Sequence, residues 1–255
     1  MIDIHAHILP FLDDGPSNLD ESVKMAVQAY HEGVQAIIAT PHHLTSKYYN
    51  DCDAVEQSVR TLNERLQEEG IPVKIMPGQE VRINRIFFRE WEKGNVLTLN
   101  HSRYMLIEFE GGVSYDQMLE WVHELRMLDL VPIIAHPERI PAVIDEPERI
   151  HELIQSGALC QATCLTIEGQ FGRKVQKTAE KLCKLGGIHL LASDAHDSLK
   201  RTFYWKLANE KLEKWMGSGW QSYVLQNAER VVHDQWIDVS TSGFSQRRKF
   251  ALFRK

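Results

Sequence analysis

The chain has 255 residues, of which 43% are hydrophobic and 25% are charged, values that are ordinary for a globular protein with one large core. The last ten residues contain five lysines and arginines and no acid, so the preceding residues carry a net charge of −11, although the whole chain carries −6. An acidic body excludes broad nucleic-acid binding, which requires a basic face to neutralise phosphates.

The cysteines and the N-terminal residues exclude several further classes of protein. The four cysteines form no CxxC pair, which argues against a zinc knuckle or a disulfide framework. The first residues alternate acid and histidine with apolar residues, unlike a signal peptide. No segment approaches the roughly 18 consecutive apolar residues of a membrane-spanning helix. We therefore expect a cytoplasmic protein.

Short apolar segments alternate with helical patterns along the chain. Asn18 and Glu21 have the spacing of a capping box, which predicts a helix that ends near Gly33. Strands are predicted at 2–7, 36–40, 73–76, 104–108, 131–135, 159–162 and 189–192. Further helices are predicted at 54–69, 115–128, 148–155, 172–185, 203–215 and 227–232. This alternation indicates an α/β fold with a parallel sheet, and about seven strands favour an irregular barrel. Residues 1–239 are expected to form a single domain, followed by a basic and aromatic tail at 240–255.

Side chains of the metal-ligand type end or follow most of the predicted strands. His5 and His7 are separated by one residue at the end of the first strand, so their side chains point the same way. Others follow the later strands: His42, Glu80, Glu108, His136, Asp194 and His196. In a parallel barrel the carboxyl ends of the strands share one mouth, where these side chains would meet. Imidazoles and carboxylates without thiolates favour two or three ions of Mn, Fe or Zn.

Each of these residues also has an ordinary structural interpretation, and only their recurrence at strand ends favours the metal site. Asp13-Asp14-Gly15 is either a tight turn or a source of one more carboxylate ligand. Arg139 and Arg201 are suited to a bidentate grip on a phosphoryl group, although arginines more often form surface salt bridges. No cysteine is followed six residues later by arginine, which excludes a cysteine-based phosphatase.

Seven strings carry a family resemblance: MIDIHAHILP at 1–10, DDG at 13–15, ATPHH at 39–43, PGQE at 77–80, IEF at 107–109, IAHPER at 134–139 and ASDAH at 192–196. In this order they resemble the PHP (polymerase and histidinol phosphatase) superfamily. Within it, the chain is similar to the CpsB/YwqE-type manganese-dependent protein-tyrosine phosphatases of bacterial capsule and exopolysaccharide loci.

The resemblance implies a distorted (β/α)7 barrel, the PHP fold, with three metal ions, normally Mn2+, per chain. By position, His5, His7, Glu80 and Asp194 would hold the first metal. Glu80, Glu108 and His136 would hold the second, and Asp14, His42 and His196 the third. Arg139 and Arg201 match the family's phosphate-gripping arginines. The implied substrate is phosphotyrosine on the tyrosine-rich tail of a partner bacterial tyrosine kinase and on its targets.

Three other functions are also compatible with the sequence. Two are enzymatic: a small-molecule phosphomonoesterase of the histidinol-phosphatase type and a TatD-like metal nuclease. The third is a regulatory module that binds phosphotyrosine without hydrolysing it. The tail, where Phe250 and Phe253 lie among cations, either contacts an anionic membrane surface weakly or is a solvated terminus.

Overall fold

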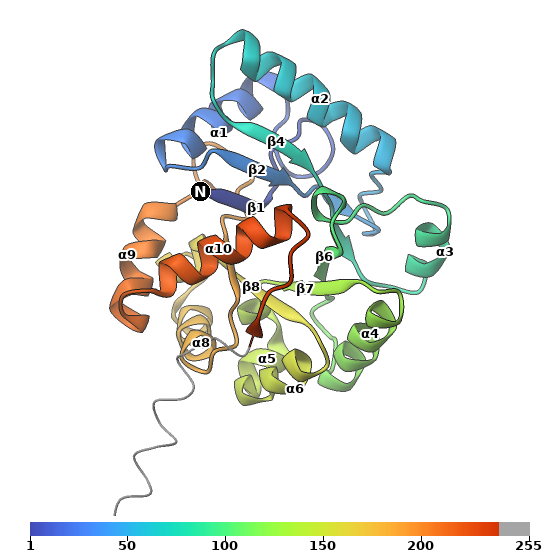
Figure 1. Cartoon of the computed structure of the whole chain (residues 1–255), viewed down its shortest axis with the longest axis vertical. Helices are drawn as coiled ribbons and strands as arrows, with labels where there is room; N and C mark the ends of the chain where they lie inside the picture. The colour runs from blue at the N-terminus through green and yellow to red at the C-terminus, as the bar shows by residue number, and fades with distance from the viewer. Residues whose placement is uncertain (240–255) are drawn as a thin grey trace, which may run out of the picture.

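Parallel strands with helices packed around them form residues 1–239, the part of the chain that the computed structural model describes (Figure 1). The strands are β1 (Ile2–Ala6), β2 (Ala36–Ala39), β3 (His42–His43), β4 (Lys74–Pro77), β5 (Glu80–Arg82), β6 (Tyr104–Glu108), β7 (Val131–Ala135), β8 (Leu159–Thr163) and β9 (Leu190–Ala192). The helices are α1 (Leu19–His31), α2 (Cys52–Glu68), α3 (Phe87–Glu92), α4 (Tyr115–Met127), α5 (Pro141–Asp145), α6 (Ile150–Gln155), α7 (Cys164–Glu168), α8 (Arg173–Lys184), α9 (Trp205–Met216) and α10 (Trp220–Val232). The predicted α/β class with parallel strands is confirmed.

Two of the predicted strands are interrupted. The sheets have the orders β1-β2-β4 and β3-β5-β6-β7-β8-β9, and all their pairs are parallel. Ala39 pairs with Pro77, and three residues further along both strands His42 pairs with Glu80, so β3 continues β2 and β5 continues β4 in one register. At the second interruption, a Cβ on Gly78 would lie 2.8 Å from a side-chain carbon of β2, which explains the glycine.

Backbone hydrogen bonds also join the segment after β9 to β1. The amide of His7 donates to the Ala195 carbonyl at 2.8 Å, and the amide of Asp194 donates to the His5 carbonyl at 2.9 Å. Ala6 and Ala195 form a parallel bridge. The carboxyl ends of these two strands, which lie far apart in the sequence, are therefore side by side.

The core has an inner and an outer part. The inner cluster collects alternate strand residues and one face of α10: Ile4, Ile38, Leu106, Ile133, Leu190 and Val231. The outer cluster lies between the same strands and the surrounding helices. Helix α10 crosses one end of the strands (Figure 1), where Asn227 donates to the carbonyl of His189, just before β9. Helix α10 thus covers the amino ends of the strands and leaves their carboxyl ends uncovered by this helix.

The helix starts agree only in part with the sequence analysis. The Asn18 side chain accepts the amide of Glu21 at 2.9 Å, as predicted for α1. The Glu21 carboxylate, however, accepts from the amide of Ser17, so the reciprocal half of the predicted capping box is wrong. A complete capping box is found instead at the start of α4, between Ser114 and Gln117.

Four helices differ from their predictions for identifiable reasons. Helices α3, α5 and α7 were not predicted, since five or six residues are too few to show a helical period. Helix α10 begins at Trp220 and not at 227, because Asn227 has the character of an N-cap but lies inside the helix. The Asn227 side chain instead donates a hydrogen bond to the carbonyl of His189, the residue just before β9.

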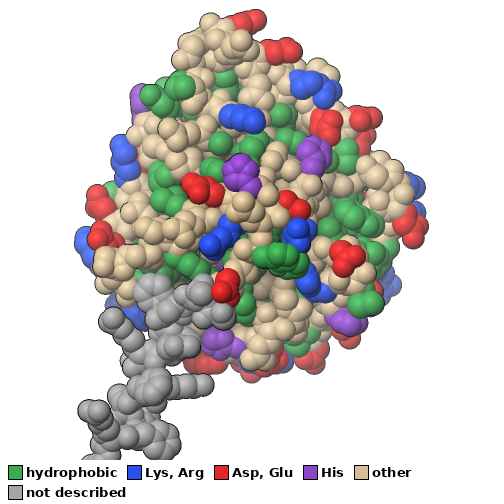
Figure 2. Space-filling model, viewed as in Figure 1, with side chains coloured by type: hydrophobic (Ala, Val, Ile, Leu, Met, Phe, Trp, Pro, Cys, Tyr) green, Lys and Arg blue, Asp and Glu red, His purple; other side chains and the backbone are tan. Residues whose placement is uncertain are grey.

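Acidic and basic side chains are interspersed on the face of the molecule drawn in Figure 2, so neither sign of charge predominates on the described part of that face. No helix within residues 1–239 combines the length and the apolar character needed to cross a membrane. The predicted tail at 240–255, and with it the predicted membrane contact, lies outside the described residues.

Candidate metal centre

The nine predicted metal ligands meet at the carboxyl ends of the strands. Seven of them belong to groups whose potential ligand atoms lie within 4.8 Å of one another. These groups are His5, His7 and Glu80; His42, Glu80 and Glu108; and His7, Asp14, His42 and His196. The other two, His136 and Asp194, contact members of these groups. The groups share residues, so all nine form one cluster.

An irregularity in β1 turns His5, and His7 just after the strand, toward the cluster. Ile4 belongs to the inner core, whereas Asp3 on the opposite side accepts a hydrogen bond from an indole of α9 at 2.8 Å. Strict alternation would put His5 on the side of Asp3. The β1–β2 pairing shifts its register between Asp3 and Ala6, and beyond this shift the Nε2 atoms of His5 and His7 lie 3.3 Å apart.

Glu80 is the centre of the cluster and is 1% exposed. Its Oε1 lies 3.0 Å from Nε2 of His136 and 3.5 Å from Nε2 of His5. Its Oε2 lies 2.8 Å from Nδ1 of His42 and 3.4 Å from Nε2 of His7. A carboxylate whose two oxygens each face two imidazoles has the arrangement of a ligand that bridges cations.

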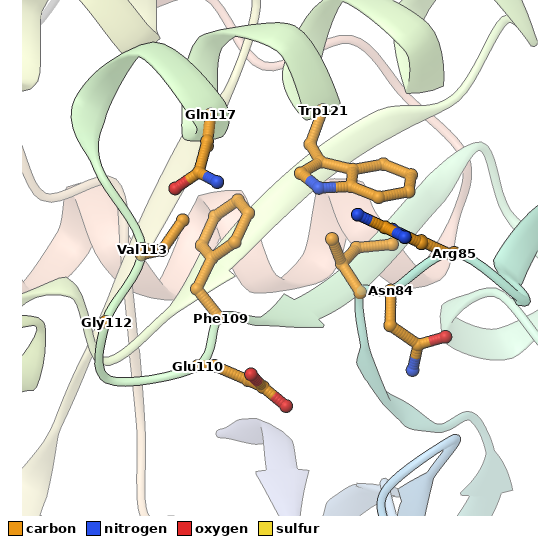
Figure 3. A pocket seen from close by; sticks show the side chains of 9 residues that line it. Asn84, Arg85, Phe109, Glu110, Gly112, Val113, Gln117 and Trp121 are labelled. Atoms are coloured by element: carbon orange, nitrogen blue, oxygen red, sulfur yellow. The ribbon is translucent and has the colours of Figure 1, made fainter.

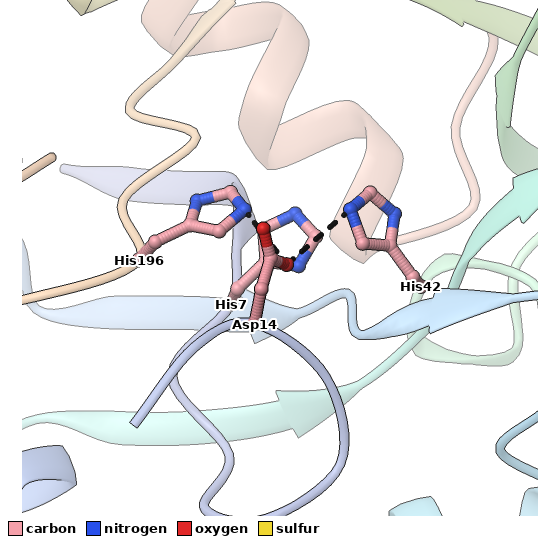
Figure 4. Close-up of side chains that lie close together, drawn as sticks. All are labelled: His7, Asp14, His42 and His196. Carbon is pink, nitrogen blue, oxygen red and sulfur yellow. Dashed lines mark ion pairs between the residues drawn. The ribbon is translucent and has the colours of Figure 1, made fainter. Parts of the chain in front are cut away.

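A second carboxylate, Asp14, lies between two imidazoles on the outer side of the cluster (Figure 4). Its Oδ1 is 3.4 Å from Nε2 of His196 and 3.5 Å from Nε2 of His42. The rings of His7 and His196 stack with centroids 3.8 Å apart. The loop after β1 therefore brings a carboxylate back to the strand ends, which was one of the two interpretations of Asp13-Asp14-Gly15.

Two members of the cluster have left-handed backbone conformations. His136 has φ of 36° and Asp194 has φ of 55°, values that side chains other than glycine seldom adopt. Asp194 directs Oδ1 to within 3.4 Å of His5 Nε2 and 3.5 Å of His7 Nε2. Such conformations persist where the surrounding structure compensates for them, and they are concentrated at functional sites.

Hydrogen bonds on the far side of the rings fix which nitrogen each histidine presents. Nδ1 of His5 contacts Oε1 of Gln161 at 2.8 Å, and Nδ1 of His7 contacts Oδ2 of Asp13 at 2.6 Å. Nδ1 of His196 lies 2.9 Å from the carbonyl of Asp194. Because these oxygens only accept, each Nδ1 carries a proton and each Nε2 is the nitrogen that faces the cluster.

Unpartnered buried atoms show that the cluster fits cations. His42 Nδ1, Glu80 Oε2 and His196 Nε2 are buried and have no hydrogen-bond partner. The first two lie 2.8 Å apart, but without the geometry of a hydrogen bond. Buried polar atoms are nearly always satisfied in native proteins, so atoms left facing one another require another partner. Divalent cations are the partners that imidazoles and carboxylates share.

Charge in the cluster supports the same conclusion. Burial acts to raise the pKa of Glu80, but His5 and the other imidazoles hold it well below its usual range. Burial likewise opposes ionisation of Asp194, but the guanidinium of Arg139 and the neighbouring imidazoles together hold its pKa well below its usual range. Burial lowers the pKa of His136 to about 4. At neutral pH Glu80 and Asp194 are therefore charged and His136 is neutral, which are the forms that bind metals.

Arginines surround the opening of the cluster. Arg139 donates to Oδ2 of Asp194 at 2.5 Å, and its guanidinium carbon lies 4.8 Å from the centre of the Phe171 ring. Arg201 places its terminal nitrogens 3.5 Å from Asp14 and 3.6 Å from Asp194. A cavity of about 250 Å³, lined by Arg139 among others, opens above the cluster. Both predicted arginines therefore lie at the site.

Three further residues of the site were not identified from the sequence. Asp13 and Gln161 orient histidines, and Arg82 forms two hydrogen bonds to Oε2 of Glu108, at 2.5 and 2.8 Å. Gln161 carried a usable signal, since it is a polar residue inside a buried strand. Asp13 could not be distinguished from its neighbour Asp14 by sequence, because the loop geometry alone decides which carboxylate faces which ring.

The thiols do not take part in this chemistry. Cys160, Cys164 and Cys183 are buried, and burial raises the pKa of each. Burial also raises the pKa of Cys52, to about 11. A nucleophilic cysteine needs a lowered pKa, so these four are thiols at neutral pH.

Replacing Asp13 with asparagine tests the orienting role of this carboxylate. Asparagine can turn its NH2 toward Nδ1 of His7, which would leave the ring proton on Nε2 and remove the lone pair from the cluster. We expect metal affinity to fall about 10- to 100-fold. Metal titration by calorimetry measures this change, and Asp53→Asn, on the exposed start of α2, is the control. An unchanged affinity would contradict the assigned role.

The fold and the cluster together define a class: an α/β protein with parallel sheets and a candidate metal site of histidines and carboxylates. Residues 1–233 match the family model described as "Capsular polysaccharide synthesis, CpsB/CapC". The chain belongs to this CpsB/CapC family.

Similar proteins cover nearly the whole chain. The tyrosine-protein phosphatase YwqE of Bacillus subtilis is 37% identical over 99% of this chain and 100% of its own length. The putative tyrosine-protein phosphatase CapC of Staphylococcus aureus is 34% identical, with the same coverage. A solved structure from work on YwqE of Bacillus subtilis and CpsB of Streptococcus pneumoniae, described as unique metal-dependent tyrosine phosphatases, has a TM-score of 0.89. It shares 37% identity and covers 93% of this chain and 96% of that one.

Proposed function

We propose that this protein is a metal-dependent protein-tyrosine phosphatase. The observation that carries the proposal is a single cluster of five imidazoles and four carboxylates with two arginines at its opening. The arginines favour a phosphate ester over an amide, since a guanidinium matches the geometry of a phosphoryl group. The names of the relatives point to the same reaction.

The nine residues of the cluster would hold three divalent cations, with Mn2+ as the expected ion and Fe or Zn as alternatives. His5, His7, Glu80 and Asp194 are assigned to the first ion, and Glu80 also contributes to the second. The second is completed by Glu108 and His136, and the third is held by Asp14, His42 and His196. His42 also faces Glu80 and Glu108, at 2.8 and 3.9 Å, so it lies between the second and third positions.

Bound cations would supply a nucleophilic water at neutral pH and neutralise part of the phosphoryl charge. Arg139 and Arg201 would bind the non-bridging oxygens of the phosphoryl group and stabilise the charge on them during in-line displacement. Asp194 holds both guanidinium groups in place before substrate arrives. The leaving phenolate has a pKa of about 10 and needs less protonation than an alkoxide, so a dedicated acid is not required.

We further propose that the two sheets form one distorted seven-stranded barrel of the PHP type, comprising residues 1–239. The common register of the interrupted strands and the bridge between Ala6 and Ala195 support this. We propose as substrate a tyrosine-phosphorylated bacterial kinase and its targets, in the cytoplasm, with a regulatory role in capsule or exopolysaccharide synthesis. The family's description supports that role.

Elemental analysis paired with phosphate release tests the proposed activity. Purified protein is assayed on a phosphotyrosine peptide before and after removal of metal with a chelator, and again after Mn2+ is added back. We expect bound divalent metal, hydrolysis that the chelator abolishes, and recovery with Mn2+. Phosphate release that is unaffected by complete removal of metal would overturn the proposal.

The same preparation distinguishes the alternatives. Faster turnover of histidinol phosphate than of the phosphopeptide would indicate a small-molecule phosphomonoesterase. Cleavage of single-stranded DNA would indicate a nuclease. Binding of the phosphopeptide without release of phosphate by the metal-loaded protein would indicate a regulatory binding module. Each of these results is incompatible with the proposed phosphatase as the principal activity.

A further inference from the structure

A second cavity, with aromatic walls, adjoins the opening of the metal centre. It has a volume of about 450 Å³ and lies between the segment after β5 and the start of α4 (Figure 3). Phe109 lines this cavity and also the smaller one above the cluster, so the two share a wall. Phe109 directly follows Glu108, which lies 3.8 Å from His136 in the cluster. The Phe109 ring is therefore the boundary that the opening of the metal centre and the second cavity have in common.

The lining of the cavity combines aromatic surface with hydrogen-bond donors that have no partner. The rings of Phe109 and Trp121 and the side chain of Val113 face it (Figure 3). Arg85 is exposed and forms no ion pair within residues 1–239. The Oε1 of Gln117 accepts the amide of the N-cap residue of α4 at 3.0 Å, which leaves the NH2 of this side chain free. The cavity thus offers rings for stacking and donors for carbonyl oxygens.

The charges at the cavity restrict what it can bind. Glu110 lies on the same lining as Arg85, and the two opposite charges offset each other. Because the two charges offset each other, neither an acidic nor a basic side chain gains net attraction from them. An uncharged aromatic side chain gains contact with Phe109 and Trp121, while peptide carbonyls next to it accept from Arg85 and Gln117.

We propose that this cavity binds an aromatic side chain of the same peptide that carries the phosphotyrosine, at a nearby position in its sequence. The inference rests on the proposed phosphatase activity and adds a determinant of peptide specificity to it. The phosphoryl group would lie at the metal centre, the chain would pass Phe109, and the aromatic neighbour would occupy the space between Phe109 and Trp121. Tyrosine and phenylalanine both satisfy this requirement.

Peptides that differ at one position test the proposal on the full-length, metal-loaded protein. A phenylalanine is placed in turn at each of the three positions on either side of the phosphotyrosine, in a background of alanine. We expect kcat/KM to rise about 10-fold when the phenylalanine is at one particular position, mainly because KM falls. We also expect the corresponding non-hydrolysable phosphonate peptide to bind more tightly, measured by isothermal titration calorimetry. Equal kcat/KM and equal binding for all positions of the phenylalanine would overturn the proposal.

Variants of the cavity link the preference to these residues. Arg85→Ala removes an exposed donor, and Gln117→Glu keeps the oxygen that caps α4 but removes the free NH2. In both, the ratio of kcat/KM for the favoured peptide to that for p-nitrophenyl phosphate should fall severalfold. Arg60→Ala, an exposed arginine on α2, should keep the ratio. If the preference for the favoured peptide persists in both cavity variants, residues outside this cavity cause it, and the proposal is wrong. Failure of the metal-loaded wild-type protein to release phosphate from any of the phosphotyrosine peptides would instead refute the proposed function.

Discussion

Glu80→Gln is expected to lower kcat for phosphotyrosine hydrolysis by about 1,000-fold or more, a loss of about 4 kcal/mol of transition-state stabilisation. Glutamine keeps the size of the side chain, but it replaces one charged oxygen with an NH2 that cannot bind a cation. Glu80 faces His5 and His7, which are assigned to the first ion, and His136, which is assigned to the second, so its loss affects two assigned ions at once.

Metal stoichiometry measured by elemental analysis is the second readout for Glu80→Gln, and we expect fewer ions per chain. Glu120→Gln, on the exposed face of α4, is the control for the chemical change itself. Circular dichroism establishes that the variant is folded. A folded Glu80→Gln protein with full metal content and wild-type kcat would refute the central position assigned to this carboxylate.

Arg139→Lys should reduce kcat/KM by about 100-fold while metal remains bound. Lysine retains the positive charge near Asp194 but loses the planar, bidentate donor set that matches a phosphoryl group. The stacking contact with Phe171 is also lost, so the new ammonium is less well positioned. Weaker inhibition by inorganic phosphate should accompany the loss, because phosphate would use the same donors.

The matched control for Arg139→Lys is Arg149→Lys. Arg149 also pairs with a carboxylate, that of Glu152, and its guanidinium carbon lies 4.4 Å from the centre of the Tyr115 ring. It is not among the cluster's contacts, so kcat/KM should stay within about twofold of wild type, as for most surface changes. If the two variants lost the same activity, the effect would come from general destabilisation and not from phosphoryl binding.

The position of each ligand at a strand end was predictable because ligand and strand are neighbours in the sequence. His42, Glu108 and Asp194 follow apolar segments that are short enough to be buried strands, and parallel strands end at a common edge. Helix starts were less predictable. Asn227 has the same intrinsic preference as Asn18, and only the contact of α10 with the strands places one inside a helix and the other at its cap.

The sequence by itself determined the class of fold, the identity of the candidate ligands and the exclusion of cysteine chemistry, because these depend on residue type and on spacing within one segment. Tertiary structure alone decided which atoms face one another. The shift of register in β1, the left-handed backbone at His136 and the choice of Asp13 over Asp14 as the partner of His7 all arise from contacts between distant segments. Local sequence does not encode such contacts, because their free energy exists only once the strands have packed together.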